Sequence, residues 1–319
     1  MNLNKQQLDS YLYTYSYSKD EQELCKMEQR AFFNVDTDSF FIKSTRAINP
    51  NRSPFMRERV DVLYSCPTFE ELHKKIFEAN LLIDETFKVI FVKNPDYEKV
   101  GGVRFNERKQ MERTIGLLIN GEVDLVTPQL LLAIMNINGK WIFGIYHKSE
   151  AIWFQHQQKP HQYSTALSTR VARAVVNIAV PYPEGMKVMD PCCGIGTVLV
   201  EALSMSVDIV GRDINRLVIP GARGNIDHFG LTGDVTLGDI RDVEGQYDVS
   251  IIDMPYNLCS VITSQEKLEM IQSARRFSRK LVIVTIEPMD TVIEAAGFQV
   301  VDRCVAKKSA FLREVIVCE

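Results

Sequence analysis

No apolar run in this 319-residue chain approaches the roughly 20 residues that a membrane-spanning helix needs. The first residues also lack the hydrophobic core of a signal peptide. The seven cysteines are odd in number and none stands in a Cys-x-x-Cys pair, which indicates reduced thiols and neither a disulfide framework nor a zinc site. These absences exclude membrane and disulfide-stabilised classes, and they predict a cytoplasmic globular protein without a metal centre.

An excess of positive charge is missing as well, since the net charge is −4. Residues 1–160 carry 21 basic and 21 acidic side chains, and residues 161–319 carry 16 and 20. Any RNA binding must therefore use local patches. The best candidate is residues 93–113, where six basic side chains are diluted by four acidic ones. We interpret this segment as a solvated loop and helix face, with contact to an RNA backbone as the alternative.

Short strands and helices are predicted for the first half of the chain. Tyrosines at every second position of residues 11–17 predict a strand. The following segment Ser18–Phe33 begins with a capping-box pattern and predicts a helix. A further short helix is predicted over Gln129–Asn136. The first half is thus expected to be a small α+β arrangement.

A polar stretch over residues 151–163 predicts a linker and the main domain boundary. Its histidines, His156 and His161, have no cysteine or aspartate partners in the sequence, and we expect both to be solvated. In the helix predicted after the linker, Arg173 and Asn177 fall outside the apolar face.

Strands and helices alternate from residue 187 to the C-terminus, which predicts an α/β domain with a mostly parallel, doubly wound sheet. Two final strands, residues 298–305 and 311–317, predict an antiparallel hairpin. The first strand ends in Asp190 and a glycine-containing turn that opens a helix. The fingerprint of an NAD site requires glycine or alanine at position 199, where this chain has Leu199. A carboxylate at Asp190 instead suits a cationic ligand such as S-adenosylmethionine.

Acidic residues follow four successive strands of this predicted sheet. They are Asp190, Asp213, Asp239 and Asp253. The carboxyl ends of parallel strands form the crevice where doubly wound folds bind ligands. In that crevice Asp213 is placed to bind both hydroxyls of a ribose, and Asp239 to bind the amine of an adenine.

The last of these residues begins the tetrapeptide Asp253-Met254-Pro255-Tyr256, which follows a β-branched run. The tetrapeptide supplies a carboxylate, a stiff turn and an aromatic ring. These are the groups needed to hold a flat base and to accept hydrogen bonds from its exocyclic amine. An ordinary Asp/Pro turn is the alternative for the tetrapeptide taken alone.

These motifs resemble the class I methyltransferases that carry Asp-Pro-x-Cys-Gly-x-Gly-Thr after the first strand and Asp/Asn-Pro-Pro-Tyr after the fourth. More narrowly, the chain is similar to the THUMP-domain tRNA guanosine N2-methyltransferases. The likeness is specific over residues 160–260 and looser over residues 60–150. The chain departs from the family at Met254, where proline is usual.

The resemblance implies a Rossmann-like methyltransferase domain over residues 164–319, preceded by a ferredoxin-like region (1–65), a THUMP-like RNA-binding domain (66–150) and the linker. It implies S-adenosylmethionine as cofactor and tRNA as partner. The implied catalytic residues are Asp253, Met254, Pro255 and Tyr256, with Tyr256 stacking on the base. The implied cofactor-binding residues are Asp190, Cys193, Gly194, Gly196, Thr197, Asp213, Asp239 and Asp253.

Two other readings of the sequence stay open. A DNA adenine or protein-glutamine methyltransferase would use the same tetrapeptide chemistry. A non-catalytic RNA-binding protein would retain the cofactor fold without activity, and Met254 is the only residue in its favour.

Overall fold

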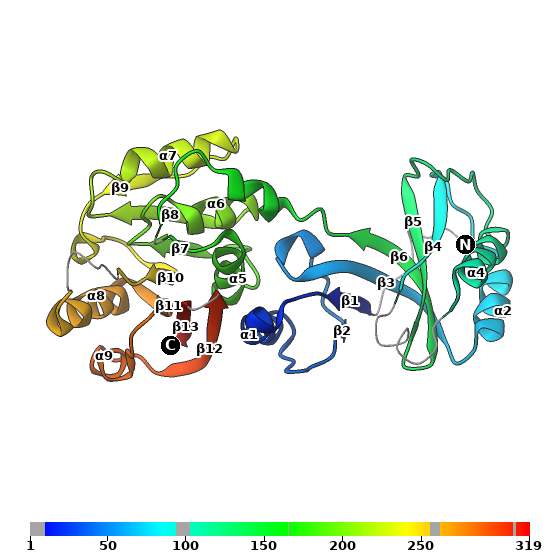
Figure 1. Cartoon of the computed structure of the whole chain (residues 1–319), viewed down its shortest axis with the longest axis horizontal. Helices are drawn as coiled ribbons and strands as arrows, with labels where there is room; N and C mark the ends of the chain where they lie inside the picture. Colours follow the sequence, from blue (N-terminus) through cyan, green and yellow to red (C-terminus); the bar gives the residue numbers. More distant parts are fainter. Residues whose placement is uncertain (1–9, 94–102, 165, 256–261, 309–310) are drawn as a thin grey trace. The chain divides into compact units, whose positions relative to one another are not determined.

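The computed structural model describes residues 10–93, 103–164, 166–255, 262–308 and 311–319 (Figure 1). Contacts between residues divide the chain into two units. The first comprises Met1–Tyr15, Ser39–Pro50 and Met56–Ser149, and the second comprises Ser16–Asp38, Asn51–Phe55 and Glu150–Glu319. No helix within the described ranges is long and apolar enough to cross a membrane.

A six-stranded sheet forms the first unit, in the order β2-β1-β3-β6-β5-β4. The strands are β1 (Tyr11–Tyr15), β2 (Phe41–Ser44), β3 (Met56–Cys66), β4 (Phe87–Phe91), β5 (Leu130–Ile137) and β6 (Lys140–Lys148). β4 and β5 are parallel, and the other neighbouring pairs are antiparallel. Helices α2 (Phe69–Ala79) and α4 (Phe105–Gly116) contribute Leu72 and Ile115 to the core beside this sheet.

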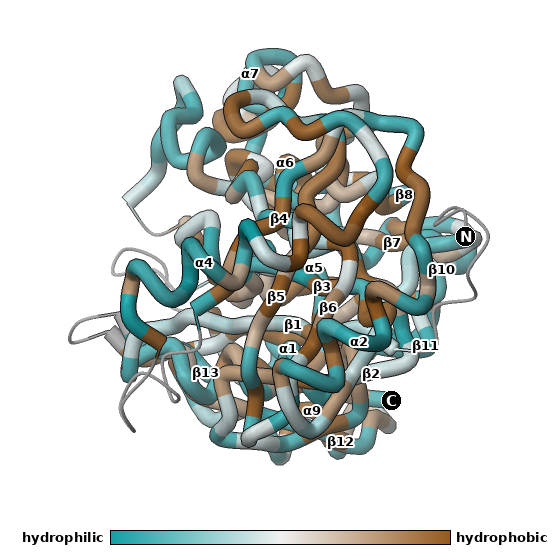
Figure 2. The backbone as a smooth tube through the Cα atoms, turned by 90° about the vertical axis from the view of Figure 1, so that its right-hand side faces the viewer, coloured by the Kyte–Doolittle hydropathy of each residue, from teal (hydrophilic) through white to brown (hydrophobic). Residues whose placement is uncertain are grey.

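The helix predicted over Gln129–Asn136 is wrong, because all of these residues except Gln129 belong to β5. A continuous apolar run of this length is compatible with a buried strand or with a buried helix. Pairing with β4 on one edge and β6 on the other decides for the strand. Figure 2 shows the largely hydrophobic path of β5 and the mainly hydrophilic α4.

Gly144 on β6 lies tightly against β3, and a Cβ there would be 2.1 Å from the carbonyl oxygen of Asp61. Because backbone atoms cannot move aside, we expect Gly144→Ala to lower the free energy of unfolding by about 3 kcal/mol in denaturant titrations. Gly139, in the β5–β6 turn, has open space around it but a φ of +80°. Gly139→Ala should therefore cost only about 1 kcal/mol of backbone strain. Equal effects of the two variants would contradict this packing.

The second unit contains a seven-stranded sheet in the order β12-β13-β11-β10-β7-β8-β9. Its strands are β7 (Lys187–Asp190), β8 (Asp208–Asp213), β9 (Val235–Leu237), β10 (Tyr247–Asp253), β11 (Ser278–Thr285), β12 (Val300–Lys308) and β13 (Phe311–Cys318). The five strands β7 to β11 are parallel, and β12 and β13 form an antiparallel hairpin that pairs with β11. The predicted doubly wound sheet with its terminal hairpin is confirmed.

The α-helices that residues 150–319 contribute to this unit are α5 (Thr169–Ala179), α6 (Thr197–Ser204), α7 (Ile219–His228), α8 (Ser264–Phe277) and α9 (Asp290–Ala295). From β7 the chain proceeds through β8 to β9 on one side, and then places β10 and β11 on the other side of β7. The strand order therefore reverses between β7 and β10, which is where doubly wound folds leave a ligand crevice at the carboxyl ends of their strands.

Two segments from the first sixty residues pack within the second unit. The predicted capping box of Ser18 and Glu21 precedes α1 (Gln22–Phe33), and this helix contacts α5 and β12. Arg30 of α1 forms an ion pair with Asp302 at 2.8 Å. The ferredoxin-like and THUMP-like domains and their boundaries stay predictions.

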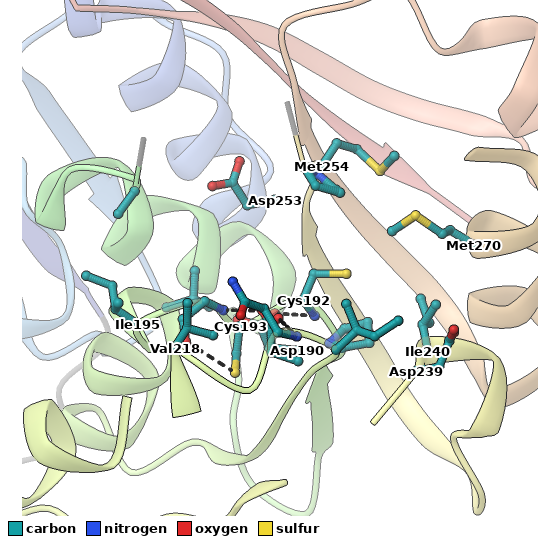
Figure 3. A pocket seen from close by; sticks show the side chains of 18 of the residues that line it. Asp190, Cys192, Cys193, Ile195, Val218, Asp239, Ile240, Asp253, Met254 and Met270 are labelled. Atoms are coloured by element: carbon teal, nitrogen blue, oxygen red, sulfur yellow. Dashed lines mark hydrogen bonds between the residues drawn. The ribbon is translucent and has the colours of Figure 1, made fainter. Parts of the chain in front are cut away.

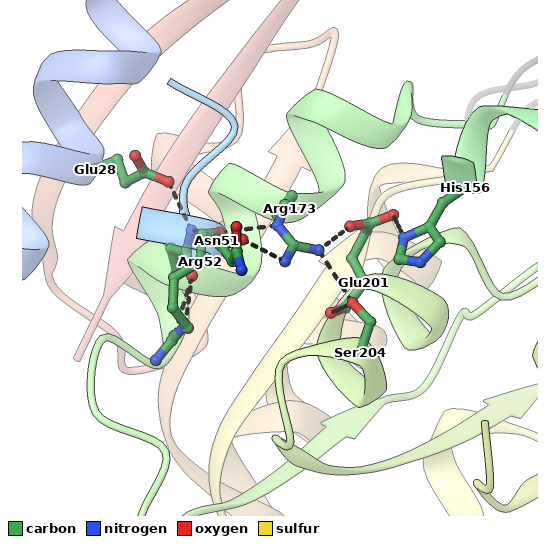
Figure 4. A network of polar contacts seen from close by, with 8 residues as sticks. Glu28, Asn51, Arg52, His156, Arg173, Glu201 and Ser204 are labelled. Carbon is green, nitrogen blue, oxygen red and sulfur yellow. Dashed lines mark hydrogen bonds and ion pairs between the residues drawn. The ribbon is translucent and has the colours of Figure 1, made fainter. Parts of the chain in front are cut away.

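His156 is buried, so the prediction that it is solvated is wrong. It lies in a 3-10 turn (Ile152–Gln158), and its Nδ1 is 2.7 Å from a carboxylate oxygen of Glu201 on α6 (Figure 4). The other oxygen of Glu201 accepts a 2.6 Å hydrogen bond from Arg173. The linker is thus anchored to the domain by a buried polar group that the sequence pattern did not reveal.

The polar side of α5 is buried too. Arg173 is 1% exposed, and its guanidinium donates to the carbonyl oxygens of Asn51 and Arg52 as well as to Glu201. Asn177 donates to Glu28 of α1 at 2.7 Å. This side of α5 faces α1 and the segment 51–55, which explains why it carries polar residues without being solvated.

Candidate active site

A cavity of about 520 Å³ lies at the carboxyl ends of the parallel strands of the second unit (Figure 3). Most of the predicted site residues line it: Asp190, Cys193, Gly194, Thr197, Asp213, Asp239, Asp253, Met254 and Pro255. Gly196 lies in the same turn but not on the cavity wall. Tyr256 falls outside the described residues, so its predicted stacking role stays a prediction.

The turn between β7 and α6 folds its backbone around the cavity. Gly194 and Gly196 have φ angles of +52° and +77°, a left-handed conformation that favours glycine. The N–H of Gly194 donates to Asp213 at 2.8 Å, and the N–H of Gly196 donates to the carbonyl of Cys193 at 2.8 Å. At the start of α6, the buried hydroxyl of Thr197 has no partner within the described part of the chain. It is a polar group suited to a ligand at the helix N-terminus.

Asp213, at the end of β8, is fixed by the backbone. Its two carboxylate oxygens accept hydrogen bonds from the N–H groups of Gly194 and Asn215, each at 2.8 Å. A carboxylate has about four lone-pair positions, so acceptor capacity remains for a ligand. These contacts tie the ends of β7 and β8 together and orient the carboxylate.

Asp190 and Asp253 lie at the ends of adjacent strands; Asp190 is buried, and Asp253 is half-buried with one carboxylate oxygen out of contact with solvent. Burial raises the pKa of Asp190 well above its ordinary value, and the neighbouring charges of Asp213 and Asp253 raise it further. Burial raises the pKa of Asp253 to about 7, against a small opposing effect of Arg313. One carboxylate oxygen of Asp253 has no hydrogen-bond partner among the described residues. Both sites would be stabilised by a cationic or hydrogen-donating ligand.

Asp239 is engaged by Arg241, which the sequence analysis did not anticipate. The guanidinium of Arg241 lies 2.6 Å from one Asp239 oxygen and also pairs with Glu269 of α8 at 3.2 Å. This hydrogen bond holds the pKa of Asp239 below its usual value. Arg241, Glu266, Glu269 and Met270 also line the cavity. No sequence motif marks these four residues. The last three lie on the helix α8, away from the strand ends where the motifs occur.

Acidic side chains dominate the described part of the cavity wall. Six carboxyl side chains line it (Asp190, Asp213, Asp239, Asp253, Glu266 and Glu269), against one guanidinium. Within the described ranges no group of three or more His, Cys, Asp or Glu is arranged to hold a metal ion. The arrangement favours a cationic organic ligand with hydroxyl and amine groups.

Met254 extends the sheet by one hydrogen bond. Its N–H donates to the carbonyl of Val284 on β11 at 2.8 Å, and its side chain is 3% exposed in the apolar cluster beneath the cavity. Figure 3 shows the side chain directed away from the Asp253 carboxylate. The carbonyl of Met254 still precedes Pro255, which confines Met254 to an extended backbone.

Replacing Met254 by proline, the residue usual in the resembling family, is expected to destabilise this chain. The variant loses the hydrogen bond to Val284. Because proline is smaller than methionine, it also leaves unfilled part of the buried space that the Met254 side chain occupies. We expect Met254→Pro to lower the free energy of unfolding by about 3 kcal/mol, and Met254→Leu by less than about 1.5 kcal/mol. Thermal and denaturant unfolding measure both. A Met254→Pro protein as stable as the parent would contradict this role of the N–H.

Asn225 on α7 has a defined structural role that the sequence motifs do not indicate. Its side chain accepts from the N–H of His161 at 2.9 Å and donates to the carbonyl of Ile195 at 2.9 Å. Asn225 thus joins the linker to the β7–α6 turn. The signal that the sequence offered for this role was an asparagine within a predicted helix.

Comparison with known proteins agrees with this geometry. Residues 156–287 match the model of the family described as RMKL-like, methyltransferase domain. Over its whole length the chain resembles the crystal structure of TrmN from Thermus thermophilus, with a TM-score of 0.50, 17% identity and coverage of 97% of this chain and 99% of that one. The fold of the second unit is the Rossmann-like fold of class I methyltransferases. Residues 156–287 are similar to the RMKL-like methyltransferase family.

Two curated relatives carry the name tRNA (guanine(10)-N2)-dimethyltransferase. The protein of Methanothermobacter thermautotrophicus is 33% identical over 178 residues, which are 52% of this chain and 52% of the relative. That of Pyrococcus abyssi is 26% identical over 219 residues, which are 62% of this chain and 65% of the relative. The chain thus spans about half to two thirds of the length of these relatives.

Proposed function

We propose that the protein is an S-adenosylmethionine-dependent methyltransferase that modifies the exocyclic N2 amine of a guanosine in tRNA. The observation that carries the proposal is the cavity with six carboxyl groups and a buried Asp253 oxygen that has no partner among the described residues. The names of the curated relatives support the substrate. The negative wall supports the cofactor, whose sulfonium and ammonium groups are cationic.

Each part of the cofactor has candidate partners on the wall. Asp190 and the turn with Cys193, Gly194, Gly196 and Thr197 would hold the methionine part. Asp213 would bind the ribose, and Asp239 would bind the adenine amine beside Arg241. When bound, the sulfonium supplies an electrophilic methyl group.

Asp253 and the carbonyl of Met254 would orient the target amine. An exocyclic amine is a poor nucleophile because its lone pair is delocalised into the ring. Two acceptors that hold its two hydrogens turn the lone pair toward the methyl group, and preorganised groups of this kind are worth several kcal/mol. A carboxylate with a pKa of about 7 is also suited to accept the proton that the methylated amine must lose.

The target base must be unpaired or flipped out of its helix to enter this cavity. In this proposal the ferredoxin-like (1–65) and THUMP-like (66–150) regions grip the RNA by its shape and backbone. The linker (151–163) joins them to the methyltransferase domain (164–319), where Tyr256 would stack on the base.

Methyl transfer from labelled S-adenosylmethionine tests the proposal directly. Unmodified tRNA, duplex DNA and a protein extract are each incubated with the enzyme, and the tRNA is digested to nucleosides. Labelled N2-methylguanosine is the expected product. Label in DNA or protein alone would favour the rival enzyme readings. Cofactor binding by calorimetry without transfer to any substrate would favour the non-catalytic RNA-binding protein.

Asp213→Ala is expected to weaken cofactor binding. The variant loses the acceptor for two hydroxyl groups, and hydrogen bonds to a charged group contribute about 1.5–3 kcal/mol each. We therefore expect the KM for S-adenosylmethionine to rise at least about 10-fold, with the KM for tRNA nearly unchanged. Asp208→Ala, at the opposite, exposed end of β8, is the matched control. A similar KM for both variants would contradict the ribose assignment.

A further inference from the structure

A second hollow of about 600 Å³ adjoins the candidate active site within the same unit. We call it the flanking groove. It shares Tyr163, Ala166 and Leu167 with the active-site cavity. Tyr163 lines both hollows and is 53% exposed. An exposed aromatic ring on a wall common to two hollows is a platform on which a planar group can stack.

The sign of the charge changes across this shared wall. Among the described residues, the active-site cavity has six carboxyl groups and one guanidinium, whereas the flanking groove has three basic side chains (Lys159, Arg170 and Lys307) and two acidic ones (Asp20 and Glu21), of which Glu21 pairs with Arg170. A phosphodiester is repelled by the first wall and attracted to the second. The groove is therefore the electrostatically favourable exit for the backbone of a nucleotide whose base lies in the cavity.

Helix α5 adds backbone donors to the groove. The residues that line it include Ser168, Thr169, Arg170 and Val171, which are the cap and first turn of this 11-residue helix. The Ser168 hydroxyl accepts from the N–H of Val171. The N-terminus of a helix carries unsatisfied N–H groups and a partial positive charge, both of which favour a phosphate.

Arg170 is held rigidly at the groove. Its guanidinium lies over the rings of Trp153 and Phe55, at 4.9 and 5.3 Å from their centroids, and its Nε is 2.8 Å from Glu21. A preformed cation costs less conformational entropy on binding than a mobile one. Lys307, on β12, is exposed and supplies a separate positive charge.

We propose that the flanking groove binds the RNA nucleotide next to the methylated one. Its phosphate lies near Lys307 and the start of α5, and its base stacks on Tyr163. This inference rests on the proposed function, because it takes an RNA strand to be the substrate of the adjoining cavity. The groove would be a positioning site: it binds the RNA strand, whereas methyl transfer takes place at Asp253.

The test compares Lys307→Gln with Lys187→Gln, a matched exposed lysine at the opposite end of the sheet. Lys307→Gln should raise the KM for tRNA about 5-fold and reduce the slope of log affinity against log salt by about 1. The kcat and the KM for S-adenosylmethionine should not move. Tyr163→Ala should raise the KM for tRNA at least about 5-fold, whereas Tyr163→Phe should retain the parental value.

A neutral methylphosphonate at each phosphate flanking the mapped methylation site localises the contact. One of these substitutions should weaken binding to the parent enzyme and leave binding to Lys307→Gln unchanged. If the effects of the methylphosphonate and of Lys307→Gln on binding are additive, or if the salt slope of Lys307→Gln is unchanged, the groove proposal is overturned. In either case the parent enzyme would still methylate RNA. A Tyr163→Ala change confined to the KM for S-adenosylmethionine would overturn the stacking role. If the parent enzyme methylates no RNA, the proposed function itself has failed.

Discussion

Replacing Asp253 by asparagine is expected to abolish most methyl transfer and at the same time to stabilise the folded protein. The variant keeps the shape of the side chain but loses the charged acceptor for the target amine. Loss of one preorganised group of this kind lowers kcat about 100- to 1,000-fold. We expect such a loss for transfer to tRNA, with little change in the KM for S-adenosylmethionine.

The stability gain follows from the burial of Asp253. Its folded-state pKa of about 7 lies above the ordinary value of 3.8, so the charged form is disfavoured by up to about 4 kcal/mol. An asparagine amide that is buried without a partner costs about 1–3 kcal/mol, which leaves a net gain of about 2 kcal/mol at pH 8. Chemical denaturation of both proteins at pH 8 measures this difference.

The pH dependence gives a second, independent check on Asp253. A raised folded-state pKa means that its contribution to stability is fully present below pH 4 and is lost as the pH rises through about 7. The advantage of Asp253→Asn should therefore grow between pH 4 and 7 and then level off. Parental kcat/KM for tRNA should rise over the same interval as the carboxylate forms. A pH-independent stability difference would contradict the burial of this charge.

Removing Arg173 is expected to produce the largest loss of stability. Arg173→Met leaves Glu201 with the His156 imidazole as its remaining side-chain partner among the described residues, and it removes one donor each from the carbonyls of Asn51 and Arg52. Breaking a buried ion pair by removing one partner costs about 3–5 kcal/mol. We expect a loss of about 4 kcal/mol in denaturant titrations, and faster proteolysis of the segment 51–55.

The control for this variant is Arg216→Met, which removes an exposed guanidinium of the same unit. It should change the free energy of unfolding by less than about 0.5 kcal/mol. Arg173→Met combined with Glu201→Gln should be less destabilised than the sum of the two single variants, because the double variant leaves no unpaired charge. Strict additivity would show that the two side chains do not act as a pair.

Strand periodicity and strand-end chemistry were predictable from the sequence. Each parallel strand is short and followed by a turn, so the succession of β7 to β11 along the chain could be inferred from local pattern alone. The same pattern located Asp190, Asp213, Asp239 and Asp253. Because carboxyl ends of parallel strands share one edge, a linear spacing of acidic residues was enough to predict a common site.

Local sequence pattern could not predict secondary structure where a helix and a strand would bury the same residues equally well. The apolar run in Gln129–Asn136 suited a helix or a strand, and only the neighbouring strands β4 and β6 decided between them. His156 and Arg173 have polar side chains that a helical or linker pattern assigns to solvent. Their burial depends on Glu201 and on the segment 51–55, which are distant in sequence.

The sequence by itself therefore determined the class of fold and the acidic character of its crevice, because both follow from short-range periodicity. Only the tertiary structure decided how Met254 is used, since its N–H pairs with Val284 on a strand thirty residues later. It also decided that Arg241 forms an ion pair with Asp239 and that Tyr163 lines a second groove beside the cavity. These features depend on contacts between segments far apart in the chain, which no local pattern encodes.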